Sequence, residues 1–141
     1  MKDKIFLDSN ILIYCYSNNE IDKQKIARSI FENTKDIYIS SQVINAVTNI
    51  LLKKLKLTTT DVVNTILQIS ALVTTFSFHI NTQLEALKLK EKYNLQFYDA
   101  LIIATAIENN CTVLYSEDMQ DGLIINNTIT IKNPFVHNDV K

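Results

Sequence analysis

Residues 5–12 read Ile-Phe-Leu-Asp-Ser-Asn-Ile-Leu, and this stretch decides the class of fold. The apolar run 5–7 is short and uninterrupted, which is typical of a strand buried on both faces of a sheet. The run ends at Asp8, and apolar residues then return at helical spacing over residues 10–16. A buried strand that leads directly into a helix predicts a parallel sheet covered by helices.

The same alternation continues along the whole chain. Further strands are predicted at residues 37–39, 74–78, 111–115, 123–125 and 128–131, and further helices at 21–31, 41–51, 61–72, 81–93 and 99–108. Gly122 and Pro134 are the single glycine and proline, so no linker is visible. The prediction is one α/β domain over residues 1–141, with a mainly parallel sheet, a core of about 1–133 and a polar tail at 134–141.

Composition excludes several classes of protein. A hydrophobic content of 47% is too high for a disordered chain. The longest apolar stretches are too short to span a membrane, and the N-terminus does not resemble a signal peptide. Cys15 and Cys111 lie in apolar runs without metal-ligand spacing, so both are predicted to be buried thiols. These features indicate a cytoplasmic protein.

The net charge of −1 argues against a protein that binds nucleic acid by general electrostatic attraction. Positive charge is only local, in lysines at 53, 54 and 56 and at 88, 90 and 92. Taken alone, either group is better explained as a solvated helix face. If RNA is a substrate, its recognition should depend on local structure.

Four aspartates lie where predicted strands end or helices begin. Asp8 follows the first strand, Asp99 opens the helix at 99–108, and Asp118 and Asp121 follow the strand at 111–115. Each also has a structural explanation: helix capping for Asp8, helix-dipole compensation for Asp99, and turn formation for the other two. Side chains at the carboxyl ends of parallel strands converge on one crevice, however, and grouped carboxylates are the ligands that Mg²⁺ or Mn²⁺ prefers.

Three segments together resemble the PIN-domain nucleases, most closely the VapC-type toxins of bacterial toxin–antitoxin pairs. They are Ile5-Phe6-Leu7-Asp8-Ser9-Asn10-Ile11-Leu12, Tyr98-Asp99-Ala100-Leu101-Ile102-Ile103-Ala104-Thr105-Ala106 and Leu114-Tyr115-Ser116-Glu117-Asp118-Met119-Gln120-Asp121-Gly122. The resemblance covers essentially the whole chain, with the family's motif order and spacing. The first segment alone is a weak signal, whereas all three in order are a strong one.

The resemblance implies a three-layer α/β/α domain that hydrolyses RNA with Mg²⁺ or Mn²⁺. Asp8, Asp99 and Asp118 would hold the metal, and Asp121 matches a further acidic position that can act through water. Three polar residues match positions that orient carboxylates or water, although capping and turn formation explain them equally well. These residues are Ser9, Asn10 and Ser116. The resemblance also implies a VapB-type antitoxin whose carboxyl-terminal segment covers the cleft, and a homodimer.

One position departs from the family pattern. PIN nucleases carry a glutamate early in the helix after the second strand, and here Ala46 stands in its place. Alanine supplies no ligand, and the neighbouring Asn45 points about 100° away around the helix. A deliberate inactivating substitution and a natural loss are both open, and either predicts weak metal binding and poor cleavage.

Two rival functions remain open. A non-catalytic PIN-like module would keep the acids for structural reasons and would act by binding another protein. A phosphoryl-transfer domain is disfavoured, because Asp8-Ser9-Asn10 lacks the second aspartate of haloacid-dehalogenase-type phosphatases, and Asp99 begins a helix where a receiver's phospho-acceptor would end a strand.

Overall fold

The computed structural model describes residues 3–137. The strands are β1 (Ile5–Leu7), β2 (Ile37–Ser40), β3 (Thr74–Phe76), β4 (Val113–Tyr115), β5 (Ile124–Ile125) and β6 (Ile129–Lys132). The helices are α1 (Ser9–Cys15), α2 (Ile21–Asn33), α3 (Ser41–Lys53), α4 (Thr59–Leu72), α5 (Ile80–Tyr93), α6 (Phe97–Glu108) and α7 (Pro134–His137).

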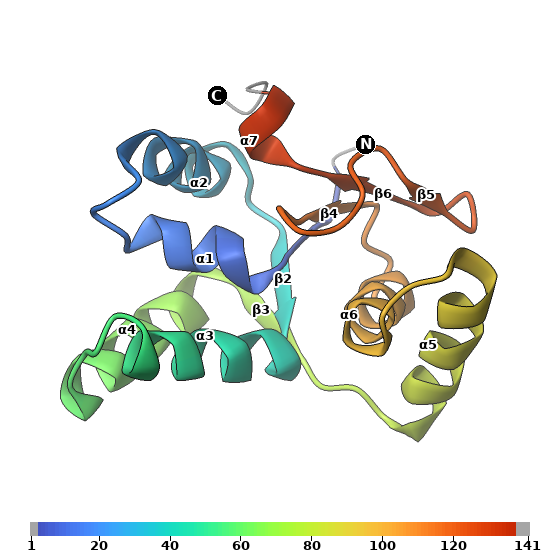
Figure 1. Ribbon diagram of the computed structural model, residues 1–141, viewed down its shortest axis with the longest axis horizontal. Coiled ribbons are helices and arrows are strands. Elements are labelled where there is room, and N and C mark those ends of the chain that lie inside the picture. The colour runs from blue at the N-terminus through green and yellow to red at the C-terminus, as the bar shows by residue number, and fades with distance from the viewer. Residues whose placement is uncertain (1–2, 138–141) are drawn as a thin grey trace.

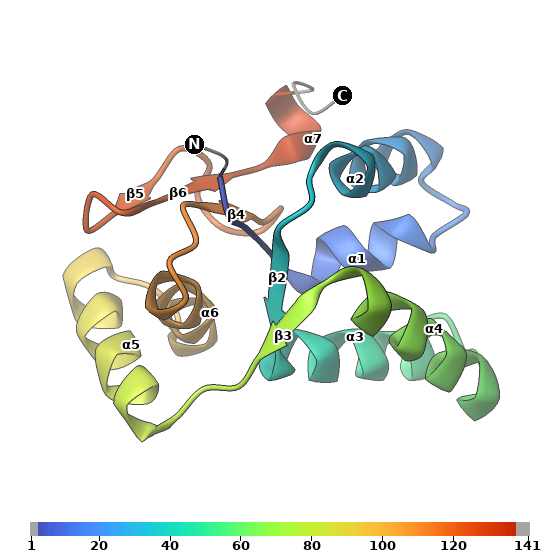
Figure 2. The ribbon, with the colours of Figure 1, turned by 180° about the vertical axis from the view of Figure 1, so that it is seen from behind.

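The strands form one six-stranded sheet in the order β3-β2-β1-β4-β6-β5. All neighbouring pairs are parallel except β5 and β6, which pair antiparallel. Helices α1 to α4 lie on one side of the sheet and α5 and α6 on the other (Figure 1), and the view from behind shows the same three layers (Figure 2). The predicted three-layer α/β/α fold is confirmed.

The strand order creates a switch point beside β1. The chain runs from β1 outward to β2 and β3, and then returns to place β4 on the opposite side of β1. Connections that leave a sheet in opposite directions open a crevice at the carboxyl ends of the two central strands. The residues that follow β1 and β4 therefore meet at this crevice, and these are Asp8 and the segment 116–118.

Short polar caps explain where several helices begin. The side chains of Asp8, Ser40 and Thr58 accept hydrogen bonds from backbone N–H groups in the first turns of α1, α3 and α4. Such caps satisfy donors that have no partner within the helix. Both Asp8 and Ser40 are buried at the ends of strands, so each strand passes directly into its helix.

Helix α6 forms the centre of the core. Every residue from Ala100 to Ala106 is buried, which explains why this stretch is apolar all round. Helix α4 is different, because Val63 and Leu67 are at least half exposed while Val62 and Ile69 are buried. Core packing therefore accounts for the apolar character of α6 but only for one face of α4.

The structure corrects two boundaries. Helix α6 begins at Phe97, so Asp99 lies inside its first turn instead of opening it. Residues 134–137, assigned from sequence to a polar tail, form α7, where Pro134 is buried and the Phe135 ring packs on Tyr14. Residues 138–141 of the expected tail lie outside the described residues. Both cysteines are free and buried, as predicted. None of the helices between residues 3 and 137 has the length and hydrophobicity needed to cross a membrane.

Candidate active site

Asp8 is the most buried of the predicted aspartates, with 8% of its surface exposed. Its Oδ1 atom accepts a hydrogen bond of 2.7 Å from the Ser9 N–H, and its Oδ2 atom accepts one of 2.8 Å from the Ser116 hydroxyl. Burial raises the pKa of the Asp8 carboxyl, whereas the bonds from Ser116 and Ser9 lower it and the nearby Asp118 raises it again. Together these effects leave the pKa of Asp8 above its ordinary value, so keeping this carboxylate charged lowers the stability of the folded protein.

Ser116 joins the two central strands at the crevice. It is fully buried, and its N–H donates to the Lys132 carbonyl at 3.0 Å, while the Asp8 N–H donates to the Tyr115 carbonyl at 3.0 Å. The Ser116 hydroxyl thus reaches Asp8 from a backbone that the sheet already holds in place. The orienting role predicted for Ser116 has this geometric basis.

Asp118 lies at the rim of the crevice and is exposed. Its Oδ2 atom accepts a hydrogen bond of 2.7 Å from the Asn10 amide, which projects from the first turn of α1. Asn10 and Asp118 are 108 residues apart in sequence. The bond therefore brings the first and third motifs together at one place.

Asp99 completes an electrostatic group from a third element, the first turn of α6. Its pKa is raised, first by burial and then by the negative charges of Asp8 and Asp118. Mutual repulsion of this kind requires that the three carboxylates face a shared region. Asp99 therefore lies within electrostatic range of Asp8 and Asp118, although the three come from separate segments.

The donor chemistry of this group suits a hard divalent cation, because all three side chains offer carboxylate oxygens whose repulsion a cation would relieve. Within residues 3–137, however, no three His, Cys, Asp or Glu side chains already stand close enough to hold one metal ion together. The negative charges favour binding of a cation, but the side chains of Asp8, Asp99 and Asp118 would have to move closer together to coordinate it.

Asp121 is placed differently from the other three aspartates. Its Oδ1 atom accepts a hydrogen bond of 2.8 Å from the Asn133 N–H, and it precedes Gly122, whose φ of +86° lies in the left-handed region. The Gly122 N–H in turn donates to the Ile131 carbonyl at 2.7 Å. This geometry matches the turn-forming explanation of Asp121.

Ala46 lies in the second turn of α3 and is half-buried, while Asn45 beside it is exposed. Gln42, one turn earlier, shares the face of Ala46 and donates to the Tyr98 carbonyl at 3.1 Å. This bond ties the start of α3 to the first turn of α6, next to Asp99. The face that carries Gln42 and Ala46 is therefore turned toward the first turn of α6 at its N-terminal end.

The contacts of Glu117, which directly precedes Asp118, are not apparent from the sequence. Glu117 forms an ion pair with Lys23, with 2.6 Å between Nζ and Oε2, and accepts a hydrogen bond of 2.7 Å from the Tyr14 hydroxyl. Burial raises the pKa of Glu117, but the bonds from Lys23 and Tyr14 outweigh burial and leave it below its usual value. Its place next to Asp118 was visible in the sequence, whereas the partner on α2, 94 residues away, was not.

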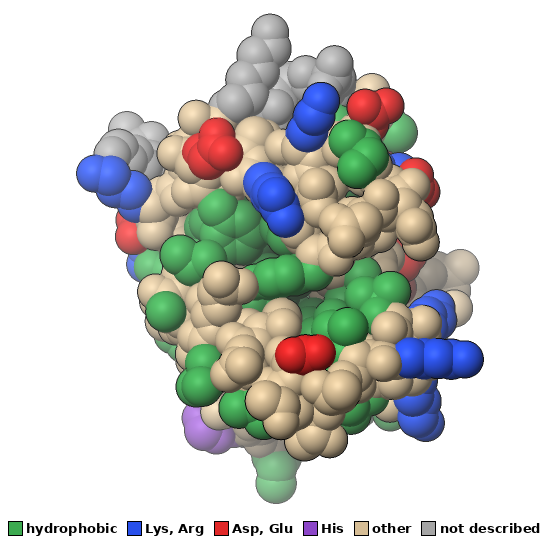
Figure 3. Space-filling view, turned by 90° about the vertical axis from the view of Figure 1, so that its left-hand side faces the viewer, with side chains coloured by type: hydrophobic (Ala, Val, Ile, Leu, Met, Phe, Trp, Pro, Cys, Tyr) green, Lys and Arg blue, Asp and Glu red, His purple; other side chains and the backbone are tan. Residues whose placement is uncertain are grey.

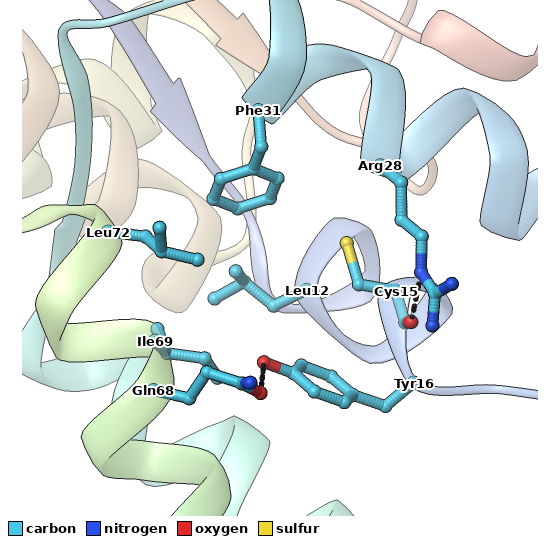
Figure 4. A pocket seen from close by; sticks show the side chains of 8 residues that line it. All are labelled: Leu12, Cys15, Tyr16, Arg28, Phe31, Gln68, Ile69 and Leu72. Atoms are coloured by element: carbon cyan, nitrogen blue, oxygen red, sulfur yellow. Dashed lines mark hydrogen bonds between the residues drawn. The ribbon is translucent and has the colours of Figure 1, made fainter.

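A separate pocket of about 230 Å³ lies between α1, α2 and α4. Hydrophobic side chains gather in the middle of this face of the molecule (Figure 3). Around the pocket, the Tyr16 hydroxyl donates to Gln68 Oε1 at 2.8 Å, and Arg28 Nε donates to the Cys15 carbonyl at 3.0 Å (Figure 4). No carboxylate lines it, so it is distinct from the acidic site.

Several solved structures share this fold at low sequence identity. A toxin–antitoxin complex from Klebsiella pneumoniae superposes with a TM-score of 0.72 at 21% identity, covering 92% of this chain and 97% of the other. VapC20 of Mycobacterium tuberculosis, described as a Sarcin-Ricin loop cleaving toxin, gives 0.68 at 14% identity, with 81% and 89% covered. VapBC2 from Rickettsia felis, bound to a promoter DNA fragment, gives 0.63 at 18% identity, with 92% and 97% covered.

Sequence comparison is more specific about the family. No curated protein shows significant sequence similarity to the chain. The model of the PIN domain matches residues 5–120, which include Asp8, Asp99 and Asp118. With the order of its motifs, its sheet topology and its acidic crevice in agreement with that match, this chain belongs to the PIN domain family.

Proposed function

We propose that the protein is a metal-dependent endoribonuclease toxin of the VapC type, weakened in this chain by Ala46. One observation carries the proposal: Asp8, Asp99 and Asp118 come from three distant segments and act on one another electrostatically. Burial and then the charge of Asp118 raise the pKa of Asp8, and burial followed by the charges of Asp8 and Asp118 raises that of Asp99. A folded protein tolerates such repulsion at a cost in stability, and a bound cation would turn it into attraction.

Mg²⁺ or Mn²⁺, when bound by Asp8, Asp99 and Asp118, would supply an acidified water and neutralise charge on the scissile phosphate. The chain's own residues prepare that site. The Ser9 N–H and the Ser116 hydroxyl hold Asp8 in one orientation, and the Asn10 amide does the same for Asp118. Asp121 supports the loop through Asn133.

Ala46 stands where the proposed site would take a further carboxylate. A glutamate at this position would project from the face of α3 that also carries Gln42, and Gln42 already contacts the residue before Asp99. The carboxylate would then add a ligand where the described residues lack a complete set. The present chain should accordingly bind metal weakly and cleave poorly, whether the alanine was introduced or arose naturally.

The substrate we propose is a structured RNA, with transfer RNA as the first candidate. The net charge of −1 and the local grouping of lysines favour recognition of a local RNA structure over general attraction to phosphate. A ribosomal sarcin–ricin loop belongs in the same panel, because VapC20 is described as cleaving it.

We also propose a VapB-type antitoxin and a homodimer in the cytoplasm. The Klebsiella and Rickettsia structures are of a toxin–antitoxin complex and of VapBC2, which supports a protein partner for this fold. Exposed apolar side chains on α4 and α5, among them Leu67 and Leu84, supply surface that such contacts would cover. Light scattering with and without a co-expressed antitoxin tests this assignment.

Restoring the missing carboxylate tests the reaction. The Ala46→Glu variant should cleave a panel of transfer and ribosomal RNAs in the presence of Mg²⁺, should leave 5′-phosphate ends, and should stop on addition of EDTA. The matched control is the double variant Ala46→Glu/Asp8→Asn, which keeps the new glutamate but loses the central ligand. Equal, metal-independent cleavage by the unmodified chain and both variants would overturn the mechanism.

A non-catalytic binding module is the second candidate. Two observations favour it: Ala46 supplies no ligand, and no three metal-binding side chains are grouped within residues 3–137. Mn²⁺ titration separates the two candidates. The nuclease scaffold should bind Mn²⁺ in a manner that Asp8→Asn and Asp99→Asn abolish, whereas the binding module should show no such dependence.

A further inference from the structure

We propose that Glu117, clamped by Lys23 and Tyr14, is a positioning residue that fixes Asp118 for metal binding. The inference rests on the proposed function and extends it to residues that do not themselves meet the metal. It concerns Tyr14 of α1 and Lys23 of α2, which bind Glu117, and Phe135 of α7, which packs against both of them.

Both carboxylate oxygens of Glu117 are engaged away from the aspartates. Oε1 accepts the Tyr14 hydroxyl at 2.7 Å and Oε2 accepts Lys23 Nζ at 2.6 Å. Lys23 Nζ also donates to the Tyr14 hydroxyl at 3.3 Å, so the three groups form a closed triangle. Glu117 is therefore occupied as an anchor and is not free to act as a fourth metal ligand.

Aromatic rings hold the ammonium group in place. Lys23 Nζ lies 4.9 Å from the centroid of the Tyr14 ring and 5.6 Å from that of Phe135. The two rings meet edge to face, with centroids 5.0 Å apart and an angle of 76° between their planes. Cation–π contacts with two rings restrict the lysine in addition to its ion pair with Glu117.

The surroundings distinguish this ion pair from an ordinary surface pair. The Lys23 and Glu117 side chains are 33% and 22% exposed, whereas those of the Lys88–Glu85 pair on α5 are 75% and 62% exposed and 3.4 Å apart. Exposed pairs of the second kind contribute little, since solvent screens them. Compared with the Lys88–Glu85 pair, the Lys23–Glu117 pair is shorter and less exposed, and it has a further partner in Tyr14. These features restrict the movement of both side chains.

The backbone transmits this restraint to Asp118. On one side, Ser116 is buried and bonded to Asp8 and to the Lys132 carbonyl. Glu117 follows, held by its side chain and by the Asn133 amide, which donates to the Glu117 carbonyl at 3.4 Å. Asp118 itself is exposed and has the Asn10 bond at its tip. Its backbone position thus depends on the two residues that precede it.

Charge balance gives Lys23 a second effect. With Lys23 in place, the charge of Glu117 is neutralised, and the negative charge in the crevice comes from the three aspartates. Without Lys23, a fourth carboxylate directly beside Asp118 would lose its cationic partner and could turn toward the crevice. The contacts of Glu117 with Lys23 and Tyr14 therefore keep the Glu117 carboxylate away from the three aspartates and also hold the backbone at residues 116–118.

The test compares Mn²⁺ affinity in the full chain and in variants of Glu117. Glu117→Ala should weaken Mn²⁺ binding by about 10-fold, the lower end of the effect of losing an outer-shell partner. Glu117→Gln should retain most of the affinity, since its amide oxygen can still accept from Lys23 or Tyr14. Glu85→Ala is the matched control, because it removes an ion-paired glutamate on α5 and should leave the affinity unchanged.

Amide hydrogen exchange provides a readout that does not require metal. In Glu117→Ala, exchange should accelerate at residues 117–119 while the amides of β1 and β4 keep their protection. Tyr14→Phe guards against a variant that fails to fold, because it removes one bond to Glu117 and keeps the ring on Phe135. It should show a smaller loss of affinity in the same direction.

The possible results separate this inference from the proposed function. If the unmodified chain binds Mn²⁺ through Asp8 and both Glu117→Ala and Tyr14→Phe match it, the positioning role is wrong and the nuclease assignment stands. A loss of melting temperature without any change in affinity leads to the same conclusion. If Mn²⁺ binding does not depend on Asp8 at all, the proposed function fails, and the positioning role fails with it.

Discussion

Replacing Ser116 with alanine should destabilise the metal-free protein by about 2–3 kcal/mol at neutral pH, because a hydrogen bond to a buried charge contributes about 1.5–3 kcal/mol. Ser116 is fully buried and donates to Asp8 Oδ2 at 2.8 Å. Its hydroxyl also accepts the Met119 N–H at 3.4 Å, a long bond that adds little. Alanine would leave the Asp8 carboxylate buried with one bond fewer.

Urea denaturation followed by circular dichroism measures this loss directly. For a chain of this size, about 2–3 kcal/mol corresponds to a fall in melting temperature of roughly 6–12 °C. The control is Ser70→Ala, which removes an exposed serine that bonds only within α4. Its effect should stay within about 0.5 kcal/mol.

The pH dependence of the loss identifies its cause. Burial and the charge of Asp118 raise the pKa of Asp8 above the ordinary 3.8, so Asp8 becomes neutral in mild acid while the protein is folded. The hydroxyl then faces an uncharged carboxyl, and its removal should cost only about 1 kcal/mol. A loss that stays the same as the pH falls from about 7.5 to below the ordinary pKa of 3.8, or a loss below about 1 kcal/mol at neutral pH, would refute the reasoning.

Three further predictions concern the site and the thiols. Asp8→Asn should stabilise the metal-free protein by about 0.5–2 kcal/mol at neutral pH, since it removes the buried charge while the amide oxygen accepts from the Ser9 N–H and the NH2 group donates to the Ser116 hydroxyl in a reversed bond. Because the pKa of Asp8 is raised in the folded state, the proton on Asp8 contributes to folding stability below pH 3.8, and this contribution is lost as the pH rises through the folded-state pKa. The gain in unfolding free energy from Asp8→Asn, measured by urea titration, should therefore grow from acid to neutral pH. A gain that does not change with pH would contradict this. Ala46→Glu should lower the urea midpoint without metal and increase the Mn²⁺-induced rise in melting temperature; the opposite signs would show that residue 46 does not face the acidic group. Burial raises the pKa of Cys15 to about 11 and that of Cys111 to about 12, so thiol reagents at neutral pH should label both slowly until urea is added; rapid labelling of the native protein would contradict their burial.

The order of elements was predictable because it depends on local periodicity. Each predicted strand and helix is present, with ends displaced by a few residues, and Asp8 follows its strand as expected. The start of α6 at Phe97 was missed, because Asp99 resembles a helix cap while the actual cap position, Gln96, carries no capping side-chain bond. Local propensity could not reveal that tertiary packing begins this helix two residues earlier.

The sequence by itself determined that Asp8 and Asp118 would leave a parallel sheet at the same edge, because each follows a strand at its carboxyl end. The tertiary structure decided that their strands, β1 and β4, are neighbours. Only the tertiary structure decided which of the acids after β4 does what. Asp121 bonds to the Asn133 backbone, and Glu117 turns away to Lys23 on α2. In an irregular loop no periodicity fixes the direction of a side chain, so its partners depend on which distant helices pack beside it.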